Sequence, residues 1–140
     1  VPQPPTHHPD GDVFVHTMLV LNRAAELGFD LPTRFATLTH AFGKASVFKQ
    51  SGNSHNHEAV GVAIVERFCE RLRIPNKLRD LAILNCGYHL HCHRLFELAP
   101  ETLHKVIIER FNALKQPERF LQFLHACQCD AQGRGPTLIN

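Results

Sequence analysis

Residues 12–44 read DVFVHTMLVLNRAAELGFDLPTRFATLTHAFGK and combine two helical patterns with a glycine–proline break between them. Gly28 is suited to end the first helix, and Pro32 is suited to the first turn of a second helix that runs to about residue 42. The apolar residues that recur at helical spacing and predict the first helix, over about 12–27, are Val15, Leu19, Val20 and Ala24.

The rest of the chain repeats this organisation, with Pro and Gly separating segments of helical period. The further helices are predicted over about 57–72, 76–91, 100–113 and 117–130, and residues 44–56 are predicted to form a polar loop. No alternating strand pattern occurs in the sequence. The pattern therefore predicts a compact all-α domain, a helical bundle of about six helices.

The composition indicates one cytoplasmic domain. The 140 residues and 44% hydrophobic content suit a single domain with its own core. The five cysteines are odd in number and form no CxxC pair, which argues against disulfides and thiolate zinc sites and predicts buried free thiols in a reducing compartment. No signal peptide or membrane-spanning apolar run is present, and a net charge of +2 does not by itself indicate a nucleic-acid partner.

The start of the sequence suggests a piece of a longer protein, because it begins with Val1 where a natural chain begins with Met. Four of the nine prolines fall within residues 1–10, so we expect an extended lead-in there. We expect the domain to cover residues 11–134 and a short tail to follow at 135–140.

Three polar residues on otherwise apolar helices are candidates for a metal site: His16, His40 and Asp130. Neutral imidazole and carboxylate are suitable ligands for divalent metals, and three such groups can converge from three helices. Spacing alone does not show convergence. The alternative is that each histidine is a buried, hydrogen-bonded core residue.

Two further clusters suit phosphate or metal. His57, in the sequence His55-x-His57, lies where the polar loop meets a helix start, which favours anions, although the spacing alone favours an ordinary first turn. His89 and His93 share a helix face at i, i+4, which fits metal, phosphate or a solvent-facing helix end. Lys44 can reach a phosphate oxygen or simply be solvated. The sequence contains no P-loop, nucleophile elbow or paired polymerase carboxylates, so the chain alone is not expected to transfer nucleotides.

An ordered set of motifs extends over almost the whole chain. In order, these motifs are VPQPPTHHP at the start, VHTMLVL around His16, RFATLTHAFGK around His40, HNHEAVG at 55–61, RLRIPNKLRDLA at 71–82, YHLHCH at 88–93 and CDAQGR at 129–134. With these motifs the chain resembles the C-terminal HD domain of the bacterial multifunctional CCA protein, a tRNA nucleotidyltransferase and HD-superfamily phosphohydrolase.

The resemblance implies an all-helical HD domain with 2′,3′-cyclic phosphodiesterase, 2′-nucleotidase and phosphatase activities. It implies a divalent metal, nickel, magnesium or manganese, on His16, His40 and Asp130. It also implies tRNA or nucleotide phosphates as partners, a nucleotidyltransferase domain before this segment, a homodimer and no membrane. The residues expected to assist catalysis are Lys44, His57 and His89, and those expected to contact phosphate or tRNA are Lys44, Arg34 and Arg134, with Arg79 as a further basic contact.

Two positions depart from the family pattern. The first His-Asp doublet reads His40-Ala41, and the second reads His89-Leu90. The first change removes a carboxylate that would ligate the metal, so we expect weaker metal binding and a weakened hydrolase. Natural decay of the site and engineering of Ala41 both remain open.

Two alternative functions also remain open. The domain serves as a non-catalytic tRNA-binding or dimerisation module, or it is a histidine-rich zinc domain. The latter fits less well because the histidines are spread over several helices.

Overall fold

The computed structural model describes residues 13–40, 42 and 57–133 of the 140-residue chain. Within these residues the regular secondary structure is all helical, without a strand, which confirms the predicted all-α class. The predicted lead-in, the polar loop and the tail lie outside the described residues. The elements are α1 (Val13–Glu26), α2 (Leu31–Thr39), α4 (His57–Leu72), α5 (Asn76–His93), a 3₁₀ turn η1 (Leu95–Glu97), α6 (Pro100–His104), a π-helical segment η2 (Lys105–Arg110) and α7 (Pro117–Gln132).

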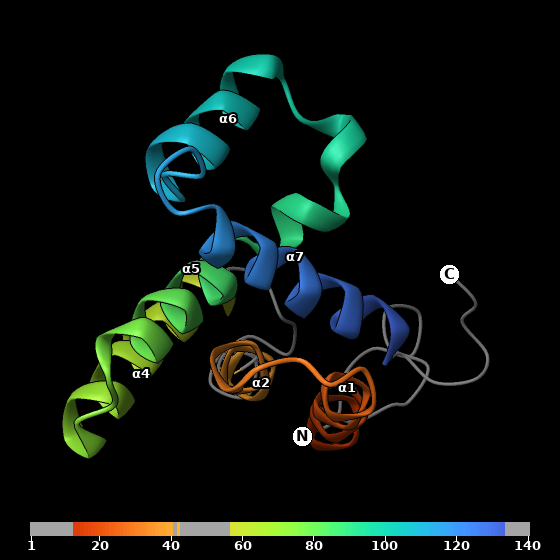
Figure 1. The fold of residues 1–140 in the computed structure, drawn as a ribbon, viewed down its shortest axis with the longest axis vertical. Coiled ribbons are helices and arrows are strands. Elements are labelled where there is room, and N and C mark those ends of the chain that lie inside the picture. The colour runs from red at the N-terminus through yellow and green to blue at the C-terminus, as the bar shows by residue number, and fades with distance from the viewer. Residues whose placement is uncertain (1–12, 41, 43–56, 134–140) are drawn as a thin grey trace.

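Helix α7 crosses the middle of the molecule (Figure 1). Helices α1 and α2 lie below it, and η1, α6 and η2 form an arch above it (Figure 1). Helices α4 and α5 form a hairpin at one side, with α5 packed on both α2 and α7. Segments from the two ends of the described chain, α1 and α7, are thereby brought into contact.

Local signals set the helix ends in the first half of the chain. Gly28 has a φ of +72°, and the bonds Gly28 N–Ala25 O (3.1 Å) and Phe29 N–Ala24 O (3.0 Å) close α1 as a Schellman motif. Asp30 then caps α2, because its carboxylate accepts hydrogen bonds from the backbone N–H of Thr33 (3.1 Å) and from its hydroxyl (2.7 Å). The short corner between α1 and α2 is therefore fixed by its own residues.

The helix predicted over 100–113 differs from the structure in its type after residue 104 and in its end. Regular α-helix ends at His104, η2 widens into π-helical turns, and helical structure stops at Arg110. Asn112 has a φ of +52°, a left-handed conformation that asparagine tolerates better than most residues. Such a residue ends a right-handed helix, and the backbone turns there toward α7.

The buried face of α1 also differs from the apolar pattern. Val20 and Ala24 are buried, but Val15 and Leu19 are 43% and 37% exposed. His16 is fully buried and lies in i, i+4 register with Val20. A polar side chain therefore takes the inward position that the apolar pattern assigned to its neighbours.

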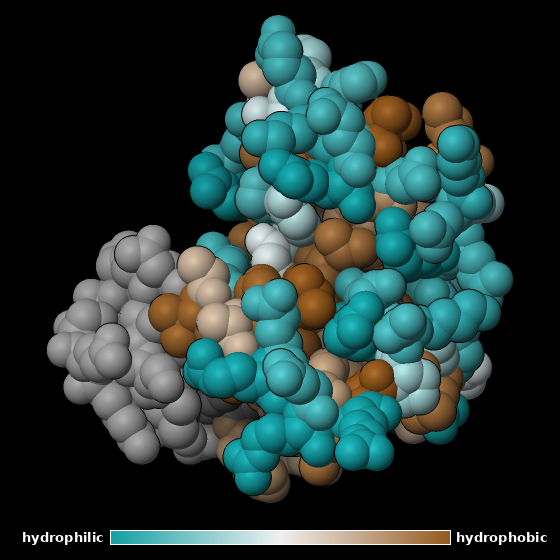
Figure 2. All heavy atoms as spheres, turned by 90° about the vertical axis from the view of Figure 1, so that its left-hand side faces the viewer, coloured by the Kyte–Doolittle hydropathy of each residue, from teal (hydrophilic) through white to brown (hydrophobic). Residues whose placement is uncertain are grey.

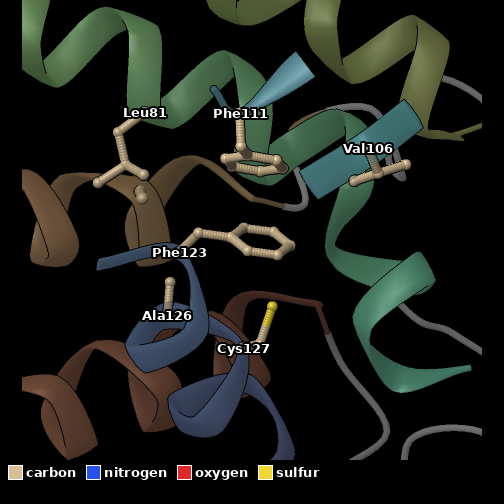
Figure 3. Close-up of a cluster of buried hydrophobic side chains, with 7 residues drawn as sticks. Leu81, Val106, Phe111, Phe123, Ala126 and Cys127 are labelled. Atoms are coloured by element: carbon tan, nitrogen blue, oxygen red, sulfur yellow. The ribbon is translucent and has the colours of Figure 1, made fainter. Parts of the chain in front are cut away.

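The main core lies between α2, α5, η2 and α7 (Figure 3). The ring of Phe111 faces that of Phe123 at a centroid distance of 4.4 Å (Figure 3). Leu81 of α5 and Ala126 of α7 belong to the same cluster. Such aromatic pairs add to the stability that burial of their apolar area provides. A second cluster, Val65, Cys69, Ala82 and Cys86, joins α4 to α5, and a third, Val20, Ala24 and Cys129, joins α1 to α7.

The surface on the α4–α5 side is hydrophilic over most of its area (Figure 2). Hydrophobic residues come to the surface in its middle (Figure 2). On the α4–α5 pair, Val62, Ile83 and Leu84 line an open cavity of about 550 Å³ that reaches Arg110 of η2. Among the helices described, none combines the length and apolarity needed to cross a membrane.

All five cysteines are free, four of them buried and Cys92 half-buried. A hydrogen bond with Cys127 of α7 lowers the pKa of Cys92 to about 7, although burial opposes this shift. Burial raises the pKa of Cys86 to about 12. The five thiols are therefore expected to differ widely in reactivity.

The core can be tested with a matched pair of phenylalanines. Phe111→Ala removes a side chain with no exposed surface, and we expect it to lower the free energy of unfolding by about 3–5 kcal/mol. Phe96→Ala removes one that is 100% exposed and should change it by less than about 0.5 kcal/mol. Urea unfolding followed by circular dichroism measures both, and equal effects would contradict the described core.

Thiol alkylation tests the environment of Cys92. Because its pKa is about 7, its thiolate predominates above neutral pH, and its reaction with iodoacetamide should level off there. An ordinary cysteine, with a pKa of about 8.5, continues to gain reactivity at higher pH. Peptide mapping by mass spectrometry should find Cys92 modified first and Cys86 only after unfolding. Cys127→Ala should raise the midpoint of the pH profile, and an unchanged midpoint would contradict the pairing.

Candidate metal centre

The structure brings His16, His40 and Asp130 together at one buried point. His16 comes from α1, His40 directly follows α2, and Asp130 lies near the end of α7. The three residues are 0%, 2% and 6% exposed. One ligand atom from each lies within 4.8 Å of the others, which fits a shared metal ion. Within the described residues no other group of this kind occurs.

The two histidines approach the same carboxylate oxygen. Nε2 of His16 lies 2.7 Å from Oδ1 of Asp130 in a hydrogen bond. Nε2 of His40 lies 3.2 Å from the same oxygen, at ion-pair distance. The rings themselves meet edge to face, with centroids 5.6 Å apart. Two imidazole nitrogens and one carboxylate oxygen thus face one small volume.

Backbone carbonyls fix the proton positions of both rings. Nδ1 of His16 is 3.2 Å from the carbonyl oxygen of Gly133, and Nδ1 of His40 is 2.6 Å from that of Thr37. A carbonyl oxygen only accepts, so each Nδ1 must carry a proton. In a neutral His40 the lone pair is then on Nε2, directed at the shared volume. Nε2 of His16 also carries a proton in its bond to the carboxylate, and it would present a lone pair to a metal after releasing that proton. Metal-binding histidines are oriented by this kind of contact.

Nε2 of His40 is a buried polar atom without a hydrogen-bond partner. It lies 3.2 Å from Oδ1 of Asp130, but this contact does not have the geometry of a hydrogen bond. A buried polar atom in this state is costly unless something else satisfies it. A cation between Nε2 and the carboxylate would do so, and the residues present therefore fit a divalent metal.

Asp130 is ionised in this setting. Burial raises the pKa of its carboxyl, but the charge of His40 and the hydrogen bonds from His16 and His93 outweigh burial and hold the pKa well below its ordinary value. An ionised buried carboxylate needs positive charge beside it. That charge comes from protonated imidazole or from a bound cation.

A second pair of histidines extends the cluster toward the surface. His89 is buried, its Nδ1 is 3.0 Å from the carbonyl of Asn85, and its ring meets that of His40 at 5.5 Å. His93 lies one turn further along α5, and its Nε2 is 2.7 Å from Oδ2 of Asp130. The ligand set predicted from the sequence did not contain His93. Its i, i+4 spacing from His89 is the signal that places it on this face.

Buried Asn85 is a second residue that sequence reasoning missed. Its side-chain NH₂ group donates to the carbonyl of Ala36 in α2 (3.2 Å), and its backbone carbonyl accepts a hydrogen bond from Nδ1 of His89 (3.0 Å). This residue therefore joins α5 to α2 beside the cluster. An isolated asparagine on a helix carries no pattern that would have identified it.

Of the other predicted site residues, Arg34 and Arg79 make contacts outside the cluster. Nε of Arg34 donates to the carbonyl of Phe29 (2.8 Å) and thus supports the α1–α2 corner, and Arg79 pairs with neighbouring Asp80 (3.1 Å). His57 is the first residue of α4, but its side chain lies outside the described residues. Also outside them are Ala41, Lys44, His55 and Arg134.

Gly133 allows α7 to approach α1 closely enough for this cluster. A Cβ placed on Gly133 would lie 2.8 Å from the backbone nitrogen of Val20 and 2.9 Å from its Cα. Contacts that short do not occur, so any larger residue would push the two helices apart. The carbonyl of Gly133 also receives the His16 hydrogen bond, which depends on the same approach.

Comparison with known proteins gives a consistent set of relatives. The chain is 50% identical to the Multifunctional CCA protein of Teredinibacter turnerae over 135 residues, which cover 96% of this chain and 33% of that protein. It is 47% identical to the protein of the same name from Alkalilimnicola ehrlichii and 41% identical to that from Acinetobacter baumannii, again over 96% of this chain and 32% of each relative.

The resemblance to multifunctional CCA proteins is therefore confirmed over nearly the whole chain, and the chain spans about a third of the length of these relatives. No protein-family model matches it. No solved structure matches it either.

Two glycine substitutions test the close approach of α1 and α7. Gly133→Ala should lower the free energy of unfolding by about 1–3 kcal/mol, because the methyl group meets the backbone of Val20. Gly87→Ala is the control, because its Cβ would meet Val62 at an ordinary 3.4 Å and alanine favours a helix over glycine by about 1 kcal/mol. Urea unfolding measures both. A Gly133→Ala variant as stable as the parent would show that the helices are not held this closely.

Proposed function

We infer that this chain, a homologue of about one third of a multifunctional CCA protein, is the HD-type domain of such a protein and acts as a weakened metal-dependent phosphohydrolase. The substrates proposed are terminal phosphates of tRNA or nucleotides, including 2′,3′-cyclic phosphates. The further partners proposed are an N-terminal nucleotidyltransferase domain and a second copy of the chain.

One observation carries the proposal. Nε2 of His40 is buried without a hydrogen-bond partner, beside an ionised carboxylate and a second imidazole. A purely structural cluster would be expected to satisfy such an atom. Two imidazoles and one carboxylate, with their second nitrogens held by backbone carbonyls, form a donor set suited to a divalent ion of the first transition row.

The residues of this chain would bind the metal ion and hold its ligand atoms in fixed positions. His16 and His40 would present Nε2, and Asp130 would present Oδ1, from three helices whose packing fixes their relative positions. A divalent ion held there supplies Lewis acidity toward a phosphoryl oxygen and activation of water. His89, buried next to His40, is proposed to support the bound phosphate.

The alanine at position 41 is the reason to expect weakened metal binding and activity. Alanine offers no carboxylate, so the cluster is less negative by one charge than a His-Asp doublet would make it. Lower negative charge reduces affinity for a divalent cation. The proposal therefore predicts a metal that dissociates readily, and activity that depends strongly on its concentration.

Calorimetric titration with nickel, manganese and magnesium tests the metal site. We expect one site per chain, and we expect Asp130→Asn or His40→Ala to weaken binding by at least about 10-fold. His104→Ala is the control, because this histidine is 66% exposed and pairs with Glu109 of η2 away from the cluster. Unchanged binding in the cluster variants would place the metal elsewhere.

Hydrolysis of a 2′,3′-cyclic nucleotide and of a generic phosphomonoester tests the activity. We expect slow turnover that requires added metal, and a gain in rate for Ala41→Asp because this variant restores a carboxylate next to His40. Metal binding without hydrolysis, in both the parent and Ala41→Asp, would instead favour the non-catalytic tRNA or dimerisation module. Salt-dependent but metal-independent tRNA binding would support that module directly.

A further inference from the structure

A fourth residue touches the carboxylate of the cluster from its other side. Asp130 has two oxygens, and His16 and His40 both approach Oδ1. Nε2 of His93 is 2.7 Å from Oδ2 in a hydrogen bond. The His93 side chain is 18% exposed, compared with 0% for His16 and 2% for His40, so it lies on the solvent side of the carboxylate.

The contacts of His93 separate it from the two other histidines. His16 and His40 carry a proton on Nδ1, because each Nδ1 faces a backbone carbonyl. A carboxylate oxygen accepts only, so the bond from His93 to Oδ2 requires a proton on Nε2 of His93. Nε2 of His16 donates to Oδ1 by the same rule, but it belongs to the group of potential ligand atoms that lie within 4.8 Å of one another, and this group does not include His93.

We propose that His93 is a positioning residue, which donates a hydrogen bond from Nε2 to Oδ2 of Asp130 and thereby holds Oδ1 toward His16 and His40 as a metal ligand. The inference rests on the metal-binding part of the proposed function. Ligating carboxylates in metal sites are commonly oriented by a hydrogen bond to their second oxygen, and loss of such a partner lowers metal affinity.

The role matters more here because of the residue at position 41. With alanine in the doublet, Asp130 is the one carboxylate in the group of potential ligands among the described residues. A carboxylate that can rotate or bind in two ways loses entropy when it ligates a metal, and no second carboxylate compensates in this group. The hydrogen bond from His93 reduces that loss by fixing the carboxylate beforehand.

Helix packing holds His93 in place for its hydrogen bond to Asp130. Helices α5 and α7 pack against each other, and Leu81 of α5 belongs to the same core cluster as Phe123 and Ala126 of α7. His93 is the last residue of α5, and its basic side chain is also favoured at the negative end of the helix. The donor is therefore held by the same packing that places Asp130.

Nickel titration of the intact chain tests the inference with three variants. His93→Phe keeps a planar ring but removes the donor, and we expect the Kd for nickel to rise about 10–100-fold. His93→Gln keeps an N–H about where Nε2 lies, and we expect it to retain most of the affinity. His91→Phe changes a histidine two residues earlier on the same helix, whose ring meets Tyr88 outside the cluster, and we expect no change. If His93→Phe does not fold, His93→Ala replaces it in the same comparison.

A spectroscopic measurement separates positioning from ligation. In zinc-loaded protein with ¹⁵N-labelled histidine, His93 should carry its proton on Nε2, and His16 and His40 should carry theirs on Nδ1. A metal-coordinated Nε2 in His93, or equal nickel affinity in His93→Phe and the parent, would overturn the positioning role and leave the metal site standing. A parent chain that binds no metal would overturn the proposed function and this inference together.

Discussion

The arrangement of the helices depends on one buried charge. Three imidazoles contact the carboxylate of Asp130, and they belong to His16 of α1, His40 at the end of α2 and His93 at the end of α5. A carboxylate taken out of water is costly unless positive groups and hydrogen-bond donors surround it. The four helices must therefore meet at this point, and the apolar clusters between them fill the space that this meeting leaves.

Much of the fold follows from local pattern. Helical period and the glycine and proline positions place α1, α2, α4, α5 and α7 to within a few residues, because those signals act within one element. The helix over 100–113 was predicted too long, because a π-helical segment and a positive φ at Asn112 leave no periodic trace. The exposure of Val15 and Leu19 was also not predictable, since it depends on which face α7 covers.

The residues of the site were likewise predictable only in part. The family resemblance named His16, His40 and Asp130, but residues up to 114 positions apart meet only through tertiary packing. The groups that orient them are harder to foresee. The carbonyls of Thr37 and Gly133 are backbone atoms without any side-chain signature, and Asn85 is a single polar residue on a helix. Of the supporting residues, His93 alone has a sequence signal, its spacing from His89.

The long separation between His16 and Asp130 has a consequence for synthesis on the ribosome. The imidazole appears early, and its carboxylate partner follows 114 residues later, in the last helix described. Until that helix has emerged, α1 has neither the partner for its buried histidine nor the surface that covers Val20 and Ala24. Domains rich in such distant contacts fold late and slowly. In the nascent chain, α1 therefore stays unpacked until α7 has been synthesised.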